Sequence, residues 1–550
     1  MTDRTMACPI FVVAAVLCGC GASGVERTTS PSPSAPPPAA TVRPITAAEV
    51  RGHLRFLADD LLEGRGMGSR GIEIAVLYNE TTFMSLGLEP AFGQSYRQPF
   101  TLRGSTPDHE PVLEYAVEGR TTTLRPWEQF VVGSHRDDIE ATVEGEIVYA
   151  GHLITAPESA WDDVGDADLR GKVLLIEINE LGNVEGGLFD GTAMTYYGRW
   201  TYKFERASEL GALGVLIIHT RQGATYDWDV VRNSWSGDDF FVSGQGLSVA
   251  FYGWVQDEVG NAIIDAAGRD ARELRASAET RDFTPVPLGV VARVTQRPSF
   301  RDVRAENVGG VLRGGSRSRT GRTVVVTAHY DHLGRDAELE GDQIYNGAID
   351  NCTASATMLT LARRLVDERQ DLSLDVVFLA VSGEEVGLHG SRYFVEHPPI
   401  PIERIWANIN LEMTSPWIET RDLYAIGASE SDLDEVAGVA AGRVGAEYVP
   451  EQGREHGFFF RSDQLSFARA GVPAVWLHEG PTASGDDPEL VSSLAEQYRE
   501  ERYHQVGDEV DPEWPLGGAV QMARWARAIV HVINERDEPL RYDEGSYFAR

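Results

Sequence analysis

Three short, almost wholly apolar runs in the second half of the chain each end on acids or histidines. They span residues 323–328, 374–381 and 405–411, and a helical pattern separates the first two. Apolar runs that alternate with helical segments predict buried parallel strands joined by crossover helices. Open α/β sheets place their sites at the carboxyl ends of such strands. We therefore expect one cluster of polar residues there, formed by His329, Asp350, Glu384, Glu385 and Glu412.

The pattern changes on the amino-terminal side of this region. Residues 46–106 read as amphipathic helices, with Leu54, Leu57, Leu61 and Leu62 on one helical face. Residues 107–297 instead show short alternating strands, Gly and Asp turns, and few catalytic candidates. This predicts a small α/β domain at 107–297, inserted into a larger domain made of 46–106 plus 298–550. The larger domain is predicted to be an α/β fold, with a mostly parallel sheet and helices on both faces.

Length and charge narrow the choice of function. At 550 residues the chain is too long for a single core, so two or three domains are expected. Acidic residues outnumber basic ones by 84 to 49, which gives a net charge of −35. Phosphate binding needs a basic surface, so the composition argues against a nucleic-acid partner.

The first residues predict export. An apolar run at 10–17 leads into Leu17-Cys18-Gly19-Cys20, which resembles the lipobox of bacterial lipoprotein signal peptides. The run is too short to span a bilayer. This implies a signal peptide at 1–19, a lipid on Cys20 that holds the protein at the bacterial cell envelope, and a disordered Ser/Pro-rich tether at 20–45. An ordinary secretory signal with a later cleavage site is the alternative.

The residue types in the predicted cluster suit a pair of zinc-type ions. An imidazole and several carboxylates supply nitrogen and oxygen donors without a thiolate, and one carboxylate is free to bridge. His329 would bind one ion, and Asp331 is placed to hydrogen-bond its other ring nitrogen. Asp350, in a loop at the start of a predicted helix at 352–366, can bridge both ions, and the helix amino terminus favours its charge.

The adjacent acids Glu384 and Glu385 predict two different roles. Neighbouring side chains on an irregular segment point in different directions, so one can bind metal while the other faces the substrate. Glu384 is the expected general base, and Glu385 is the expected metal ligand. Buried carboxylates that converge with a histidine repel one another, which itself argues for bound dications.

Taken together, these motifs resemble the di-zinc exopeptidase family (clan MH) that contains bacterial leucine-type aminopeptidases, glutamate carboxypeptidases and glutaminyl cyclases. The resemblance rests on the segments AHYDHLG, GAIDN, SGEEVGLHGS, RSDQLSFARAGVPAVWL and RYHQVGDEV. It implies two Zn²⁺ ions bridged by Asp350. By the same resemblance, His329 and Glu412 bind one ion, and Glu385 and His504 bind the other.

Two positions depart from the family pattern. Glu412 stands where many members have Asp, so a longer arm must reach the metal, and a shifted ion or altered affinity is one interpretation. Gln464 stands where histidine is common, which affects a nearby contact rather than a ligand. His478 is the one rival to His504 as the final ligand, and the other histidines, including His332, are expected to be structural.

The expected function is metal-dependent removal of one residue from a peptide's amino end. The resemblance implies that water bridging the ions loses a proton to Glu384 and attacks the scissile carbonyl, and that Glu384 returns the proton to the leaving amine. The inserted segment 107–297 resembles a protease-associated domain, a non-catalytic cover that shapes access to the site. A carboxypeptidase, a glutaminyl cyclase-like enzyme and a catalytically silent binding homologue are the alternatives.

The choice between the two peptide ends rests on charge. An exopeptidase must neutralise the charged terminus that it grips, so acids favour an ammonium and arginines favour a carboxylate. The site segments are rich in acids: Glu384, Glu385 and Glu412, and, in the segment before His504, Asp486, Asp487 and Glu489. Basic candidates are few, chiefly Arg392 and Arg461, and both are expected to pair with acids. This balance favours an aminopeptidase.

Overall fold

The computed structural model describes residues 43–137, 142–181, 188–189, 191–235, 238–315 and 321–549. The predicted signal peptide, Cys20 and most of the tether lie outside these ranges, so they remain predictions. Residues from Arg43 onward form one compact unit. None of the helices in the described ranges has the length and apolarity needed to cross a membrane.

A ten-stranded mixed sheet carries the three predicted strands. Its members are β1 (Glu89–Pro90), β2 (Arg97–Pro107), β11 (Asp239–Val242), β14 (Pro298–Leu312), β15 (Thr323–His329), β18 (Asp375–Val381), β19 (Ile405–Leu411), β20 (Asp422–Ile426), β21 (Glu447–Tyr448) and β22 (Ala474–Glu479). Their order is β11-β2-β14-β18-β15-β19-β22-β20-β21, and β1 pairs with β14. The central strands β18, β15, β19 and β22 run parallel, whereas β14, β2 and β11 on one side and β20 on the other are antiparallel to their inner neighbours. The predicted α/β fold is confirmed, but the sheet is mixed, with parallel pairing among the four central strands and between β20 and β21 at one edge.

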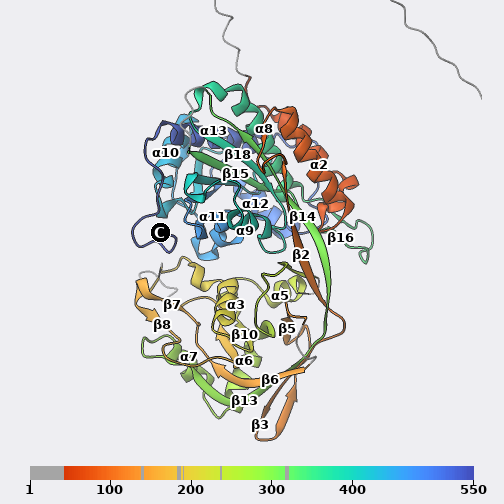
Figure 1. Cartoon of the computed structure of the whole chain (residues 1–550), viewed down its shortest axis with the longest axis vertical. Coiled ribbons are helices and arrows are strands. Elements are labelled where there is room, and N and C mark those ends of the chain that lie inside the picture. Colours follow the sequence, from red (N-terminus) through yellow and green to blue (C-terminus); the bar gives the residue numbers. More distant parts are fainter. Residues whose placement is uncertain are drawn as a thin grey trace, which may run out of the picture. The chain divides into compact units, whose positions relative to one another are not determined.

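Helices cover both faces of this sheet, as predicted (Figure 1). They are α1 (Ala47–Leu57), α2 (Arg70–Ser85), α8 (Ala354–Asp367), α9 (His389–Glu396), α10 (Leu433–Arg443), α11 (Gln464–Arg469), α12 (Leu490–Glu501) and α13 (Gly517–Glu535). Successive residues of β15 enter different cores, because side chains alternate along a strand. Val324 and Val326 pack in a core shared with α1, α8 and α13, while Val325 packs in a core shared with α9 and α11. Burial on both faces explains why the run is wholly apolar.

The first helix shows where the predicted pattern ends. Thr46 caps α1, and Leu54, Leu57 and Leu62 are buried as expected. The prediction was wrong for Leu61, whose side chain is 79% exposed. The helix stops at residue 57 and residues 60–65 form a tight turn, so helical periodicity no longer places Leu61 on the buried face.

A second sheet lies wholly within the stretch predicted as an insertion. Its strands are β3 (Val112–Val117), β4 (Arg120–Thr123), β5 (Phe130–Gly133), β6 (Thr142–Tyr149), β9 (Val173–Glu177), β10 (Gly214–His219), β12 (Phe251–Gln256) and β13 (Val286–Thr295). Short helices accompany it, among them α3 (Trp200–Glu209), α4 (Arg221–Ala224), α5 (Trp228–Ser234), α6 (Asp257–Ala266) and α7 (Ala271–Ala278). Two short strand pairs complete the described strands: β7 (Thr155–Ala156) with β8 (Trp161–Asp162), and β16 (Gly334–Arg335) with β17 (Ile344–Tyr345). The exact domain boundaries stay a prediction, since β11 comes from this stretch but pairs with β2 of the larger sheet.

Candidate metal centre

Three parallel strands deliver the predicted cluster to one edge of the larger sheet. His329 is the last residue of β15, and it pairs in register with Val381, the last residue of β18. Glu384 follows β18 by three residues, and Glu412 directly follows β19. The order of the strands therefore brings together side chains that are far apart in the sequence, as the prediction required.

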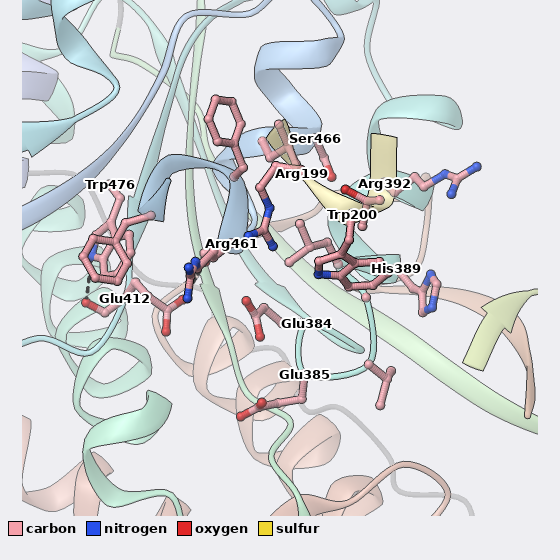
Figure 2. Close-up of a pocket in the computed structure, with 18 of the residues that line it drawn as sticks. Arg199, Trp200, Glu384, Glu385, His389, Arg392, Glu412, Arg461, Ser466 and Trp476 are labelled. Carbon is pink, nitrogen blue, oxygen red and sulfur yellow. Dashed lines mark hydrogen bonds between the residues drawn. The ribbon is translucent and has the colours of Figure 1, made fainter. Parts of the chain in front are cut away.

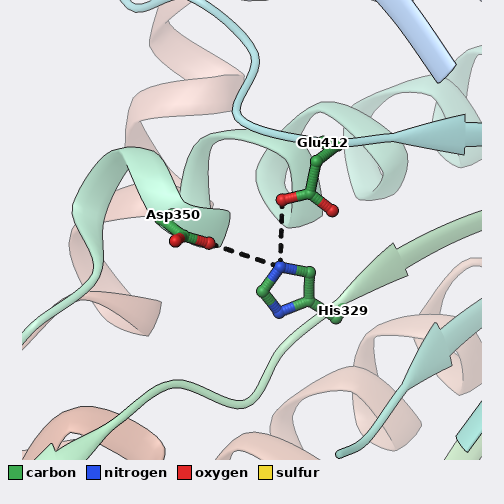
Figure 3. Close-up of side chains that lie close together, drawn as sticks. All are labelled: His329, Asp350 and Glu412. Carbon is green, nitrogen blue, oxygen red and sulfur yellow. Dashed lines mark hydrogen bonds and ion pairs between the residues drawn. The ribbon is translucent and has the colours of Figure 1, made fainter. Parts of the chain in front are cut away.

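The first group of candidate ligands is built on His329. Its Nε2 lies 3.0 Å from Glu412 Oε1 and 3.3 Å from Asp350 Oδ1 (Figure 3). All three side chains are buried, and their ligand atoms lie within 4.8 Å of one another. One imidazole and two carboxylates form a donor set that suits zinc.

The second group uses the other oxygen of Asp350. His504 Nε2 lies 3.2 Å from Asp350 Oδ2 and 3.3 Å from Glu385 Oε2. Asp350 thus presents one oxygen to each histidine, which is the arrangement that a bridging carboxylate needs. The structure brings together all five residues predicted as ligands, and their role as ligands stays a prediction.

The loop that carries Asp350 is held in place by its own turn geometry and by hydrogen bonds to the Asp508 carboxylate. Gly347 has a φ of 58°, and a Cβ there would lie 2.2 Å from the Asp350 carbonyl oxygen, so glycine is needed at this turn. Residues Ala348–Thr353 form a π-type turn that leads into α8, and the Asp350–Asn351 peptide bond is cis. Asp508 accepts hydrogen bonds from the backbone nitrogens of Ile349 and Asp350, at 3.0 and 3.1 Å. Two distant parts of the chain therefore fix the position of Asp350.

Glu384 lies beside the two groups of ligands, and with His329 and Glu385 it forms another group whose possible ligand atoms lie within 4.8 Å of one another. Its Oε2 is 3.9 Å from His329 Nε2, and its carboxylate lines the cavity (Figure 2). Burial raises the pKa of Glu384 well above its ordinary value, and the carboxylates of Glu412 and Glu385 raise it further, while His329 opposes the rise. So many acids in one buried site repel one another, and dications would remove that repulsion. The residues present therefore fit a pair of zinc ions.

Asp331 supports the site differently from the prediction. The Nδ1 of His329 lies 3.2 Å from the backbone oxygen of Asp331, while the nearest carboxylate oxygen is 3.9 Å away. The Asp331 carboxylate instead accepts from the backbone nitrogens of Glu384 and Glu385, both at 3.3 Å. The backbone carbonyl sets the orientation of the imidazole, and the carboxylate holds the segment that carries the two acids.

Two residues near the centre were missed by sequence reasoning. His332 was predicted to be structural, yet its Nδ1 lies 2.5 Å from Glu385 Oε1, and with Asp350 it forms a further group able to hold a metal. Arg65 is buried and donates to the backbone oxygens of Tyr330, Leu57, Asn346 and Gly347. The signal for His332 was its place in the AHYDHLG segment, beside His329. No local pattern marks Arg65, whose turn is typical of a simple chain reversal.

The residues around Glu412 explain how the longer side chain is held. Ser462 Oγ donates to Glu412 Oε2 at 2.7 Å, and Glu412 Oε1 reaches His329. Gln464 accepts from Asn410 and donates to a backbone oxygen, so it acts as a buried structural contact. His478 lines the cavity but contacts the Glu479 backbone and stacks on Tyr424, whereas His504 contacts Asp350 and Glu385.

A cavity of about 1190 Å³ opens onto the centre. Its lining combines Glu384 and Glu385 with aromatic side chains. Tyr196, Trp200 and Phe240 come from the stretch 107–297, and Trp417 and Trp476 come from the larger domain. The predicted acids Asp486, Asp487 and Glu489 are exposed and do not line it, so that part of the charge argument was wrong. The segment that carries these acids turns their side chains to solvent, away from the metal centre.

Known proteins resemble this chain in sequence and in fold. Residues 307–529 match peptidase family M28. The chain is 28% identical over 193 residues to the aminopeptidase YwaD of Bacillus subtilis (strain 168), over 34% of this chain and 39% of that protein. It is 37% identical over 136 residues to a probable zinc metalloprotease of Pyricularia oryzae, over 24% of this chain and 26% of that protein. The aminopeptidase from Aneurinibacillus sp. strain AM-1 aligns in structure with a TM-score of 0.51 and 20% identity, over 90% of this chain and 95% of that one.

The match to peptidase family M28 covers residues 307–529, which is less than half of the 550-residue chain. The chain spans only 39% and 26% of the two curated relatives. At 20% identity, the structural likeness shows the shared fold.

Proposed function

We propose that the protein is an exported, zinc-dependent aminopeptidase that removes the amino-terminal residue of peptides. The observation that carries the proposal is the division of the Asp350 oxygens between His329 and His504, with Glu384 facing the cavity beside them. Two zinc ions held by these histidines, Asp350, Glu412 and Glu385 would polarise a peptide carbonyl and acidify a bound water.

The chain's own residues supply the proton transfers. Glu384 lies 3.9 Å from His329 and is not one of the five proposed ligands, so it is free to accept a proton from the attacking water. After the carbon–nitrogen bond breaks, the same carboxyl returns that proton to the leaving amine. Asp331 keeps Glu384 in place through the backbone nitrogen of Glu384.

Several observations favour the amino end of the peptide. Glu384, Glu385, Glu412 and Glu479 line the cavity, and such a concentration of carboxylates attracts an ammonium. YwaD and the Aneurinibacillus protein are both called aminopeptidases. The predicted lipid on Cys20 would hold the enzyme at the cell envelope, where its substrates would be exported or external peptides.

The test is the identity of the bond that is cut. Zinc-loaded protein is incubated with a short peptide and with the same peptide acetylated at its amino terminus, and the products are identified by mass spectrometry. We expect release of the first residue from the free peptide and no cleavage of the acetylated one. Release of the last residue from the acetylated peptide would make the protein a carboxypeptidase, and no cleavage of either would support a silent homologue.

A further inference from the structure

Two arginines face the acid-rich cavity from different parts of the chain. Arg199 precedes α3, which belongs to the stretch between residues 107 and 297, and Arg461 ends the short helical turn Phe458–Arg461 of the larger domain. Both line the cavity that opens onto the metal centre. Figure 2 shows their guanidinium groups pointing into the same part of the cavity as Glu384.

Neither arginine has an acidic partner among the described residues. Arg461 donates to the His456 backbone oxygen at 2.7 Å and to Thr225 Oγ1 at 3.4 Å, and both acceptors are neutral. The Nε of Arg199 is shielded from solvent and has no hydrogen-bond partner in the described part of the chain. The prediction that Arg461 pairs with an acid was therefore wrong.

Another arginine of the same cavity behaves in the ordinary way. Arg392 pairs with Glu396 at 3.1 Å on the surface of α9. In a chain with a net charge of −35, two neighbouring arginines without a carboxylate are unusual. Their lack of counter-charges distinguishes them from an ordinary rim arginine such as Arg392.

The two guanidinium groups are close enough to affect each other. Burial lowers the pKa of Arg199 to about 10, and the charge of Arg461 contributes to the fall. Burial also lowers the pKa of Arg461. Both groups stay charged at neutral pH, so two partly buried positive charges lie side by side. Such a pair costs free energy, which a bound anion would offset.

The pair lies near the reacting centre. Arg461 is followed by Ser462, whose hydroxyl donates to the candidate ligand Glu412 at 2.7 Å. Tyr503 lines the same cavity as Arg461 and stacks on His504 with a ring separation of 4.0 Å. One extended peptide residue spans about 3.5 Å, so a substrate held at the metals reaches the arginines within a few residues.

We propose that Arg199 and Arg461 form a subsite that binds a carboxylate of the peptide substrate. A planar guanidinium donates two parallel hydrogen bonds to a carboxylate, and two such groups can hold both of its oxygens. The inference rests on the proposed function, which makes a peptide the occupant of the cavity. Its consequence is a preference for short peptides with a free carboxyl terminus, or for peptides with an acidic residue after the cut.

Two matched substrate pairs distinguish these sources of the carboxylate. Leucyl-alanine is compared with its amide, which removes only the terminal charge. Leucyl-glutamate α-amide is compared with leucyl-glutamine α-amide, which removes only the side-chain charge. Because a hydrogen bond to a charged group contributes more than a neutral one, we expect kcat/KM to favour the charged member of one pair by about tenfold or more.

Variants connect the preference to the two arginines. Arg199→Gln and Arg461→Gln should each bring the ratio of kcat/KM between the charged and the uncharged peptide of the affected pair toward one. Arg199→Lys should keep part of the preference for the charged peptide. Arg392→Gln is the matched control, because its charge is already paired with Glu396, and it should leave the ratio unchanged. Equal rates within both pairs, or a preference that survives both glutamine variants, would overturn the subsite.

A binding measurement separates failure of the subsite from failure of the proposed function. Calorimetric titration of zinc-loaded Glu384→Gln protein with the same four dipeptides reports affinity without turnover. We expect the charged member of one pair to bind about tenfold more tightly, and Arg199→Gln in this background to remove the difference. Equal affinities within both pairs contradict the subsite even if the wild type is an active aminopeptidase. A clear difference supports the subsite even if no peptide is hydrolysed.

Discussion

Replacing Glu368 by Gln should destabilise the protein without touching the metal centre. Glu368 directly follows α8, the helix whose other end carries the Asp350 loop, and its side chain is 4% exposed. Arg527 donates to both of its oxygens at 2.7 and 2.6 Å, Arg364 contacts Oε1 at 2.7 Å, and His531 contacts Oε2 at 3.0 Å. The carboxylate therefore ties α8 to α13.

The pKa of Glu368 gives the size of the effect. Burial alone would raise this pKa, but hydrogen bonds from His531 and Arg527 lower it from 4.5 to about 2. One pKa unit corresponds to about 1.4 kcal/mol, so the ionised carboxylate contributes about 3 kcal/mol at neutral pH. Glutamine keeps the size but removes the charge, and it leaves Arg364 and Arg527 without their counter-charge. We expect a loss of about 2–3 kcal/mol.

The sign of the pH dependence follows from the lowered pKa. Stabilisation by a group with a depressed folded-state pKa is complete above its unfolded pKa and is lost as the pH falls through the folded value. The difference between wild type and Glu368→Gln should therefore be full at pH 7 and shrink from about pH 4.5 toward pH 2.

Urea denaturation followed by circular dichroism measures this difference. Glu435→Gln is the matched control, because Glu435 is 72% exposed and its contact with Arg536 is a surface pair that contributes little. Metal content, measured by atomic emission, should be normal in both variants. Equal urea midpoints for wild type and Glu368→Gln at pH 7, or a difference that grows on acidification, would refute the reasoning.

Three further predictions concern the centre and the predicted anchor. Glu384→Gln should lower turnover by about 100-fold, as expected for a lost general base, with near-normal zinc content. Glu385→Gln should instead lose zinc. If Glu384→Gln lost zinc and Glu385→Gln kept it, the roles of the two acids would be exchanged. Purified protein should hold close to two zinc ions, and chelation should abolish hydrolysis; full activity after exhaustive chelation would exclude the di-metal interpretation. Asp350→Asn should weaken zinc binding at both sites, while His329→Ala should weaken it mainly at one. In a bacterial host the protein should take up labelled fatty acid and fractionate with membranes, and Cys20→Ser should abolish both; equal labelling of the two forms would remove Cys20 as the anchor.

The sequence predicted the centre well where local pattern and topology agree. His329, Glu384 and Glu412 lie at or just beyond the ends of apolar runs, so the rule for parallel strands places them at one edge of the sheet. Asp350 was recognisable because a glycine turn and a helix start surround it. The role of the Asp331 carboxylate was not predictable, because which atom of a residue faces a neighbour depends on backbone geometry.

Other features depend on contacts between distant segments. Arg65 reaches backbone oxygens near residues 330 and 346, more than two hundred positions away. Arg199 belongs to a stretch that showed few catalytic candidates, and only the folded chain places it beside Arg461. The exposed acids at 486–489 were misassigned for the same reason, since composition near a ligand says nothing about which side chains enter the cavity.

The connection of the stretch 107–297 to the larger sheet has a consequence for the base. β2 leads into this stretch and β14 leads out of it, and the two strands pair antiparallel along residues 97–107 and 298–308. β14 also pairs with β18, the strand that precedes Glu384. On the other side of Glu384, His389 Nε2 lies 2.7 Å from the backbone oxygen of Phe240, a residue of β11. The segment with the two acids is thus held at both ends by strands that enter, leave or belong to the predicted insertion. A fragment limited to residues 307–529 would keep the pairing of β14 with β18 but would lack β2, Phe240 and Arg199, so we expect the stretch 107–297 to be part of the working site as well as its cover.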